Sequence, residues 1–208
     1  MSENPNYMLY LTEAPFELVD LINTCYQDIN ESPIPFIKEF IEQKPKKQYW
    51  LYAPGENARN WHEFYENGIM ALGWDEIGDL QQYKTRSDIK KALVQAYGGD
   101  GSKKNDVTAN DDLQNKINIG DIVIAKKGRG ELLGYGVVTS DYKYDNNRSE
   151  YHKLREVDWK LKGNWKVDFS LVLKTLTDIT KYASDHPAYD TYYERLLGIM
   201  GVNNKTEK

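Results

Sequence analysis

Two glycines inside one apolar run are the feature that most constrains how this chain folds. The run from Leu132 to Tyr144 has the composition of a long strand, but Gly134 and Gly136 interrupt it. Glycine within a strand often marks a bulge or a sharp bend, because it has no side chain to keep a neighbouring backbone away. The run therefore predicts a small, strongly bent sheet or barrel.

Strands and helices alternate along the chain after residue 48. Short apolar runs predict strands over residues 49–53, 69–72, 121–125, 157–161 and 165–171, and Gly163-Asn164 is expected to form the turn between the last two. Helical spacing, caps and stop signals predict helices near residues 57–67, 87–97, 108–117, 173–179 and 192–200. Ser87 is the expected N-cap of the second helix, and Thr108 with Asp111 resembles a capping box. Together these elements predict an α+β fold.

The two ends of the chain differ from this middle part. Apolar residues recur at helical spacing over 14–29 and again over 34–43, and Pro45 ends the second stretch. Residues 1–47 are therefore expected to form a helical N-terminal appendage, residues 48–200 a domain, and residues 201–208 a disordered tail.

The aromatic residues are unusual in kind. The chain has 16 Tyr and 5 Trp but only 5 Phe, so most of its rings carry a polar group. Such rings suit half-wet pockets, where one edge packs and the other forms a hydrogen bond. The net charge of −5 does not indicate a nucleic-acid binder, but residues 1–48 hold 8 acids and 4 bases and so account for −4 of it.

The sequence argues against several classes of protein. No apolar run of 18 residues and no secretory signal are present, and the single Cys25 allows no intrachain disulfide, so a cytoplasmic protein without membrane contact is expected. No P-loop, Rossmann or G-x-S-x-G motif occurs, which disfavours an enzyme. The three histidines show no metal-ligand spacing, and no metal or cofactor is expected.

A family resemblance follows from the order of several short motifs. The stretches Tyr49–Gly55, Gly73-Trp74, Ile119–Ile124 and Leu133–Val138, with a helix containing Trp61 between the first two, resemble an EVE domain. Among EVE domains, the chain is most similar to those at the N-terminus of McrB-type modification-dependent restriction GTPases. The resemblance covers about residues 48–200.

The resemblance implies a PUA-like fold, which is a bent mixed β-barrel with flanking helices, related to YTH and ASCH domains. It also implies a nucleic-acid reader that holds a modified base in an aromatic cage. Flipping a base out of a duplex costs a few kcal/mol, whereas stacking on aromatic faces returns roughly 1–3 kcal/mol per base. Burying a methyl group adds about 0.8 kcal/mol, so such a cage favours the modified base.

Site residues are carried over by position. Trp74, after the second strand, matches the cage tryptophan of YTH-like domains, although a core position is the alternative. The turn after the first strand implies base-edge contacts, and Asn suits an adenine edge. The expected cage residues are Trp74, Trp61, Tyr142 and Tyr144, the base-edge contacts are Ala53, Gly55 and Asn57, and the phosphate contacts are Lys126, Lys127, Arg129, Lys143 and Arg148. For Trp61 the alternative is a core position, and Phe64 and Tyr65 on the same helix face favour that alternative.

The first functional hypothesis is a DNA-binding specificity domain of a McrB-like restriction system. Its partner would be double-stranded DNA with a modified, methylated base, and in the full system a fused AAA+ GTPase domain and a McrC-like nuclease subunit. The alternatives are an EVE/YTH-like reader of modified RNA, or a module that binds a nucleoside or a protein. N6-methyladenine, 5-methylcytosine and bulkier cytosine derivatives all remain open as the modified base.

Overall fold

The computed structural model describes residues 47–99 and 102–202. The chain divides into two compact units, Met1–Lys46 and Lys47–Lys208, and the fold given below is that of the second. The helical appendage expected over residues 1–47 lies outside the described residues, except for Lys47. Residues 203–208 of the expected tail also lie outside them.

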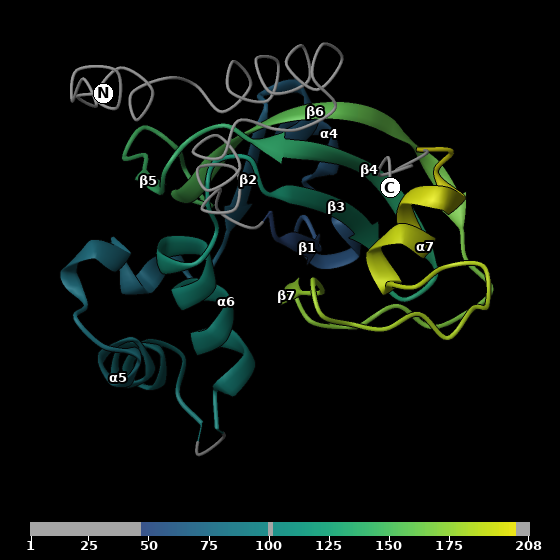
Figure 1. The fold of residues 1–208 in the computed structure, drawn as a ribbon. Coiled ribbons are helices and arrows are strands. Elements are labelled where there is room, and N and C mark those ends of the chain that lie inside the picture. Colours follow the sequence, from purple (N-terminus) through teal and green to yellow (C-terminus); the bar gives the residue numbers. More distant parts are fainter. Residues whose placement is uncertain (1–46, 100–101, 203–208) are drawn as a thin grey trace, which may run out of the picture. The chain divides into compact units, whose positions relative to one another are not determined.

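One mixed sheet is the centre of this unit (Figure 1). In the described part of the chain it has seven strands, six of them in the order β2-β6-β4-β3-β1-β7, with β5 paired to β6. The pair β1–β3 is parallel and the other pairs are antiparallel. The strands are β1 (Tyr49–Tyr52), β2 (Ile69–Leu72), β3 (Ile122–Lys127), β4 (Glu131–Val138), β5 (Lys143–Tyr144), β6 (Lys153–Lys166) and β7 (Leu176–Asp178).

The bend predicted at the two glycines is confirmed. The β4–β6 register shifts between Leu132 and Gly134 and again between Tyr135 and Gly136. A Cβ atom on Gly134 would collide with the Leu161 carbonyl oxygen, and one on Gly136 would lie 2.8 Å from the carbonyl oxygen of Asp158. Both glycines therefore let β6 approach β4 more closely than any side chain would allow.

A single buried hydroxyl joins two strands that are far apart in the strand order. Tyr52 on β1 donates to the carbonyl oxygen of Ala71 on β2 at 2.6 Å and accepts from the Ala71 N–H at 3.0 Å. Because β2 is the end of the strand order, these Ala71 groups face away from the neighbouring strand β6. The sheet is therefore curled so that β2 comes close to β1, as in a half-barrel.

Helices flank the sheet (Figure 1). They are α4 (Trp61–Glu66), α5 (Arg86–Tyr97), α6 (Lys104–Asn115) and α7 (Tyr192–Ile199), with the short 3-10 helices η1 (Glu56–Ala58), η2 (Asp75–Ile77) and η3 (Leu80–Gln82). Arg155 of β6 holds α6, because its buried guanidinium donates to the carbonyls of Leu113 at 2.6 Å and Gln114 at 3.0 Å. These carbonyls are in the last turn of α6, where a cation also interacts favourably with the helix dipole.

The fold class expected from the sequence, α+β with a bent mixed sheet and flanking helices, is confirmed. The turn predicted at Gly163-Asn164 is wrong, because β6 runs through both residues and pairs with β4 as far as Lys166. The helix predicted over residues 173–179 is also wrong, because β7 pairs there with β1.

Three helix starts differ from those predicted. The helix α4 starts at Trp61 rather than near residue 57. The N-cap of α5 is Thr85 rather than Ser87, and it forms a capping box with Asp88. The helix α6 starts at Lys104, upstream of Thr108. The Thr108 hydroxyl accepts a hydrogen bond from Arg86 at 2.7 Å, so this contact between the two helices replaces the expected cap.

Candidate functional site

A pocket of about 440 Å³ opens where five segments of the chain meet. The segments are the turn after β1, the two residues after β2, the β3–β4 hairpin, the segment with Tyr151, and residues 173–175. The pocket is lined by Ala53, Gly55, Glu56, Asn57, Gly73, Trp74, Lys126, Gly128, Tyr151, Leu173 and Thr175. Its volume is within the range of about 300–1,000 Å³ that is typical of small-molecule sites.

Unusual backbone conformations concentrate around this pocket. Asn57, Trp74 and Tyr151 line it with φ angles of 52°, 60° and 56°, and Ala58, next to Asn57, has φ 58°. Elsewhere in residues 47–99 and 102–202 only Lys103 is a non-glycine residue with positive φ. Such conformations cost of order 1–3 kcal/mol each and cluster at functional sites, so the pocket is the best candidate for a site in the described chain.

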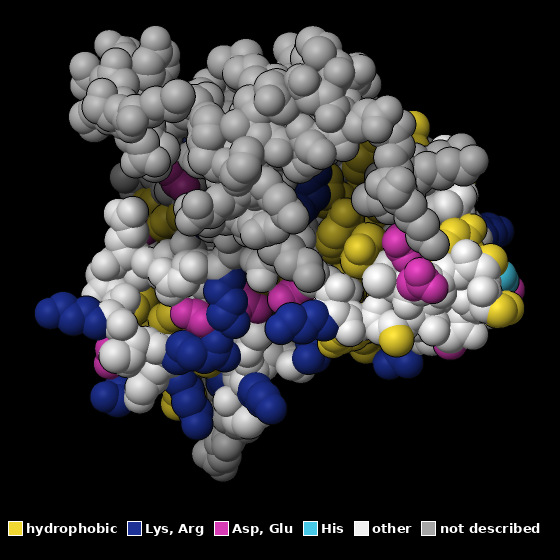
Figure 2. Space-filling model, in the orientation of Figure 1, with side chains coloured by type: hydrophobic (Ala, Val, Ile, Leu, Met, Phe, Trp, Pro, Cys, Tyr) yellow, Lys and Arg dark blue, Asp and Glu magenta, His cyan; other side chains and the backbone are white. Residues whose placement is uncertain are grey.

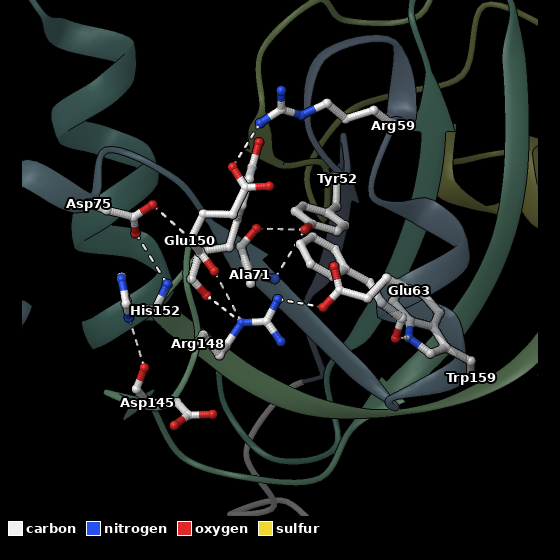
Figure 3. Close-up of polar contacts among 12 residues, drawn as sticks. Tyr52, Arg59, Glu63, Ala71, Asp75, Asp145, Arg148, Glu150, His152 and Trp159 are labelled. Atoms are coloured by element: carbon white, nitrogen blue, oxygen red, sulfur yellow. Dashed lines mark hydrogen bonds and ion pairs between the residues drawn. The ribbon is translucent and has the colours of Figure 1, made fainter.

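Asp75 connects the segments that carry the two aromatic residues of the pocket. Its carboxylate accepts the backbone N–H of Tyr151 at 2.8 Å and that of His152 at 3.1 Å, and Figure 3 shows the contact with His152. Asp75 directly follows Trp74, whose carbonyl accepts from the buried Lys153 ammonium at 2.6 Å. The left-handed backbone of Trp74 and that of Tyr151 are therefore tied together across 77 positions of sequence.

Arg148 supports the same segment from the other side. Its Nε donates to the carbonyls of Glu150 at 3.2 Å and Tyr151 at 3.1 Å, and its terminal nitrogen bonds Glu63 of α4 at 2.5 Å (Figure 3). A Cβ atom on Gly73 would lie 3.5 Å from the Tyr151 ring. The ring thus lies within van der Waals distance of a Cβ at this glycine, at the pocket wall.

Four of the seven residues that the resemblance assigned to the base come together at this pocket. They are Ala53, Gly55 and Asn57 in the turn after β1, and Trp74 after β2. The Asn57 side chain is exposed and has no hydrogen-bond partner among the described residues. The buried Asn60 Nδ2, close behind Gly55, also has no partner there. Of the two amides, only that of Asn57 lines the pocket, so Asn57 is the one available to a ligand.

The other three aromatic residues lie elsewhere. Trp61 is buried against Ala125 and Leu133, and it meets Trp159 edge-on at 4.8 Å between ring centroids. Tyr142 is buried, and its hydroxyl donates to Asp79 at 3.0 Å and accepts from the Leu80 N–H at 3.1 Å.

Tyr144 is half-buried and stacks on His152 at 5.5 Å. It lines a different, open hollow of about 900 Å³ together with Lys143 and Arg148. Tyr144 and Lys143 are therefore separated from the pocket that contains Trp74.

Of the five residues expected to contact phosphates, two have no side-chain partner among the described residues and three are bound to other groups of the protein. Lys127 and Arg129, at the β3–β4 turn, are exposed and form no ion pair or side-chain hydrogen bond in the part of the chain that the structure describes. Lys143 pairs with Glu156 at 2.6 Å, and Arg148 is bound to Glu63. Lys126 is 1% exposed, and its ammonium donates to the carbonyl of Gly128 at 3.1 Å.

Six pocket residues were not among the expected site residues: Glu56, Gly73, Gly128, Tyr151, Leu173 and Thr175. Tyr151 lies in the segment after the long strand, where the resemblance placed the second cage wall, but its left-handed backbone carries no signal in the sequence. Leu173 was assigned to a helix by its spacing from Leu176. The polar residues next to Glu56 are typical of any turn, so nothing in the sequence set this acid apart.

Comparison with known proteins identifies a family. Residues 50–183 match the model of the family described as Domain of unknown function (DUF8426). The chain belongs to this family. Among curated proteins, none matches the chain in sequence.

Two solved YTH domains are similar in structure at low sequence identity. The Mmi1 YTH domain is 15% identical with a TM-score of 0.30, and the match covers 57% of this chain and 53% of that domain. The YTH domain of Zygosaccharomyces rouxii MRB1, solved in complex with N6-methyladenosine RNA, is 11% identical with a TM-score of 0.36, covering 76% of this chain and 90% of that domain.

Within the described residues, no three His, Cys, Asp or Glu side chains are grouped so that they could hold a metal ion. None of the helices in that part of the chain has both the length and the apolar character that a bilayer crossing requires.

Two buried lysines next to the pocket have shifted pKa values. Burial lowers the pKa of Lys153 to about 8, with the nearby Asp75 opposing the shift. Burial, and then the charge of Arg129, lower the pKa of Lys126 to about 8. Burial also raises the pKa of Tyr52 and that of Tyr142.

These shifts predict that stability has a maximum in mildly alkaline solution. The unfolded chain holds its lysine protons up to about pH 10.5, so between about pH 8 and pH 10 the unfolded state binds more protons and the free energy of unfolding rises, by about 1–3 kcal/mol per lysine. Above about pH 10 it falls, because tyrosines ionise in the unfolded chain while Tyr52 and Tyr142 stay protonated in the fold.

Urea denaturation across this pH range measures the effect. Lys153→Met is expected to reduce the rise, whereas Lys90→Met, at an exposed position on α5, is expected to leave it unchanged. A free energy of unfolding that declines steadily from pH 8 to pH 10 in the unsubstituted protein would contradict the prediction.

Proposed function

We propose that this domain binds a methylated base of double-stranded DNA, turned out of the helix into the pocket between Trp74 and Tyr151. The observation that carries the proposal is the pocket itself, where two aromatic side chains on left-handed backbone meet a turn with an unpaired Asn57 amide. An indole at a left-handed position costs free energy that glycine would not. That cost is understandable if the ring has a ligand to stack on.

The energetics favour a methylated base over a plain one. Stacking on two aromatic faces contributes roughly 1–3 kcal/mol per base and offsets the few kcal/mol needed to turn the base out. A methyl group that fills an apolar part of the pocket contributes about 0.8 kcal/mol more, or about a fourfold preference. A hydrogen bond that only the modified base can accommodate would increase this preference.

Polar groups at the turn after β1 suit the edge of a base. The Asn57 amide offers both a donor and an acceptor, which is the pattern that an adenine edge requires. The carboxylate of Glu56 can accept a hydrogen bond from an exocyclic amine, as carboxylates do with cytosine. Trp74 and Tyr151 would thus supply affinity, and the turn would supply the choice of base.

The distribution of charge supports a nucleic-acid partner despite the net charge of −5. Lys127 and Arg129 are exposed at the β3–β4 turn beside the pocket, and neither has an ion-pair partner among the described residues. Further Lys and Arg side chains gather over the α5–α6 pair (Figure 2), and exposed Lys84, Lys90 and Lys104 form no ion pair among the described residues. Contacts of this kind to phosphates position a duplex without reading its sequence.

The wider role that we propose is that of a specificity domain in a McrB-like restriction system. In such a system this domain would recognise the modified site and catalyse nothing itself. A fused AAA+ GTPase and a McrC-like nuclease subunit would then carry out translocation and cleavage. The motif resemblance over residues 48–200 is the support for this role.

A titration of the full chain by fluorescence anisotropy tests the proposal. The ligands are one duplex with N6-methyladenine, 5-methylcytosine or no modification at a single position, and the N6-methyladenosine RNA strand of the same sequence. We expect one methylated duplex to bind at least about fourfold more tightly than the plain duplex. Equal affinity for all duplexes would refute a methyl reader, and tighter binding of the methylated RNA would identify an RNA reader instead.

A further inference from the structure

Leu173 is an exposed apolar side chain at the mouth of the pocket. It is 60% exposed, and it lines the same pocket as Trp74 and Tyr151. A leucine exposed to this extent gains little from folding, because most of its apolar surface remains in water. Ile119 is exposed to the same extent, so what sets Leu173 apart is its place in the lining of the pocket.

The backbone around Leu173 is fixed at both ends. The N–H of Leu171 donates to the carbonyl of Arg129 at 2.9 Å, and the carbonyl of Thr175 accepts from the N–H of Ala53 at 2.8 Å. Leu171 is buried, whereas Leu173 and Lys174 are exposed. Residues 172–174 therefore form a short arch, anchored to the β3–β4 turn on one side and to the turn after β1 on the other, that presents Leu173 outward.

Unpaired cations flank this arch. Lys174 is next to Leu173, and Arg129 shares the hydrogen bond that anchors the arch. Lys127 lies in the same β3–β4 turn as Arg129. The structure records no ion pair or side-chain hydrogen bond for these three cations within residues 47–99 and 102–202. An apolar side chain between free cations matches a duplex, which has an apolar stack of bases between two phosphate backbones.

We infer that Leu173 is a wedge that enters the duplex beside the target base and occupies the space that the base leaves. Apolar side chains such as leucine are inserted between base steps by other DNA-binding proteins, and they stabilise the unstacked state. This inference rests on the proposed function and makes it more specific, because a wedge is useful for a duplex and has no role with a single strand. Leu173 then determines which form of nucleic acid the pocket accepts.

The test compares Leu173→Ala with the unsubstituted chain on three ligands. They are a matched duplex, the same duplex with a mismatch opposite the target base, and the single strand alone, each with N6-methyladenine, 5-methylcytosine or no modification at that base. Binding is measured by fluorescence anisotropy. Ile119→Ala is the matched control, because Ile119 is also 60% exposed but does not line the pocket.

For the matched duplex we expect Leu173→Ala to weaken binding by about tenfold, since the cost of opening the pair is no longer offset. The loss should be smaller for the mismatched duplex and absent for the single strand. Leu173→Met should restore most of the affinity, and Ile119→Ala should change none of the three.

An equal loss on all three ligands would overturn the inference, because Leu173 would then be a wall of the pocket. No loss on any ligand would overturn it as well. In both cases the unsubstituted chain would still prefer the methylated ligands, so the proposed function would survive. A chain that prefers no methylated ligand would instead refute the proposed function.

Discussion

Replacing Trp74 with alanine is expected to weaken the binding of methylated duplex by about 5- to 150-fold. This range corresponds to the loss of one aromatic stacking partner, roughly 1–3 kcal/mol. The preference for the methylated over the plain duplex should shrink at the same time, because the indole is one of the two rings that line the pocket. Fluorescence anisotropy with both duplexes measures the affinity and the preference together.

Two variants separate stacking from other effects of the Trp74 substitution. Trp74→Phe keeps an aromatic face and should retain most of the affinity. Tyr182→Ala removes an aromatic ring that is 42% exposed outside the pocket, and it should change nothing. Thermal denaturation of each variant checks that the fold is intact. A Trp74→Ala chain that is folded and binds as tightly as the unsubstituted chain would rule out the indole as a stacking face.

Replacing Gly134 with alanine is expected to destabilise the fold by about 3 kcal/mol, the upper part of the range for overpacked cores. The added Cβ would meet the backbone carbonyl oxygen of Leu161, and a carbonyl within a sheet cannot move aside as a side chain can. Relief would require β4 and β6 to separate at the bulge. Urea denaturation measures the loss as a lower midpoint with an unchanged slope.

Gly130→Ala provides the matched control for Gly134. Gly130 lies in the turn before the same strand, has no positive φ angle, and nothing within 4 Å would contact a Cβ placed there. Its replacement should change the free energy of unfolding by no more than about 0.5 kcal/mol, as is usual for surface positions. If the two variants were equally stable, the close approach of β6 would not depend on glycine.

The bend also connects the fold to the pocket. The β3–β4 register shifts between Ala125 and Lys126, and Lys126 and Gly128 line the pocket just beyond this shift. The hairpin that presents Lys127 and Arg129 is therefore the continuation of the bent strands. A partly folded Gly134→Ala chain should accordingly lose ligand affinity along with stability.

Much of the fold could be predicted from the sequence because the signals for its strands and bends are local. Apolar runs predicted β1, β2 and β3 within one or two residues of their observed bounds, and the glycines in β4 predicted its bend. Local signals failed where a partner strand decided the outcome. Gly163 is an ordinary turn residue in isolation, but pairing along β4 keeps β6 extended through it. The segment with Leu176 has helical spacing, but it pairs with β1 as strand β7.

The short-range features of this protein follow from its amino-acid sequence alone: its α+β class, the bend at Gly134 and Gly136, an aromatic residue two positions after β2, and a surplus of rings with polar groups. Only the tertiary structure decided which rings meet at one pocket. Trp74 and Tyr151 come together because Asp75 accepts the backbone N–H groups of residues 76 and 77 positions away. The same packing leaves Lys127 and Arg129 exposed to solvent but buries Lys126. Which rings meet and which cations are buried depend on contacts between distant segments. No single stretch of sequence contains this information, because burial and pairing are properties of the folded surroundings.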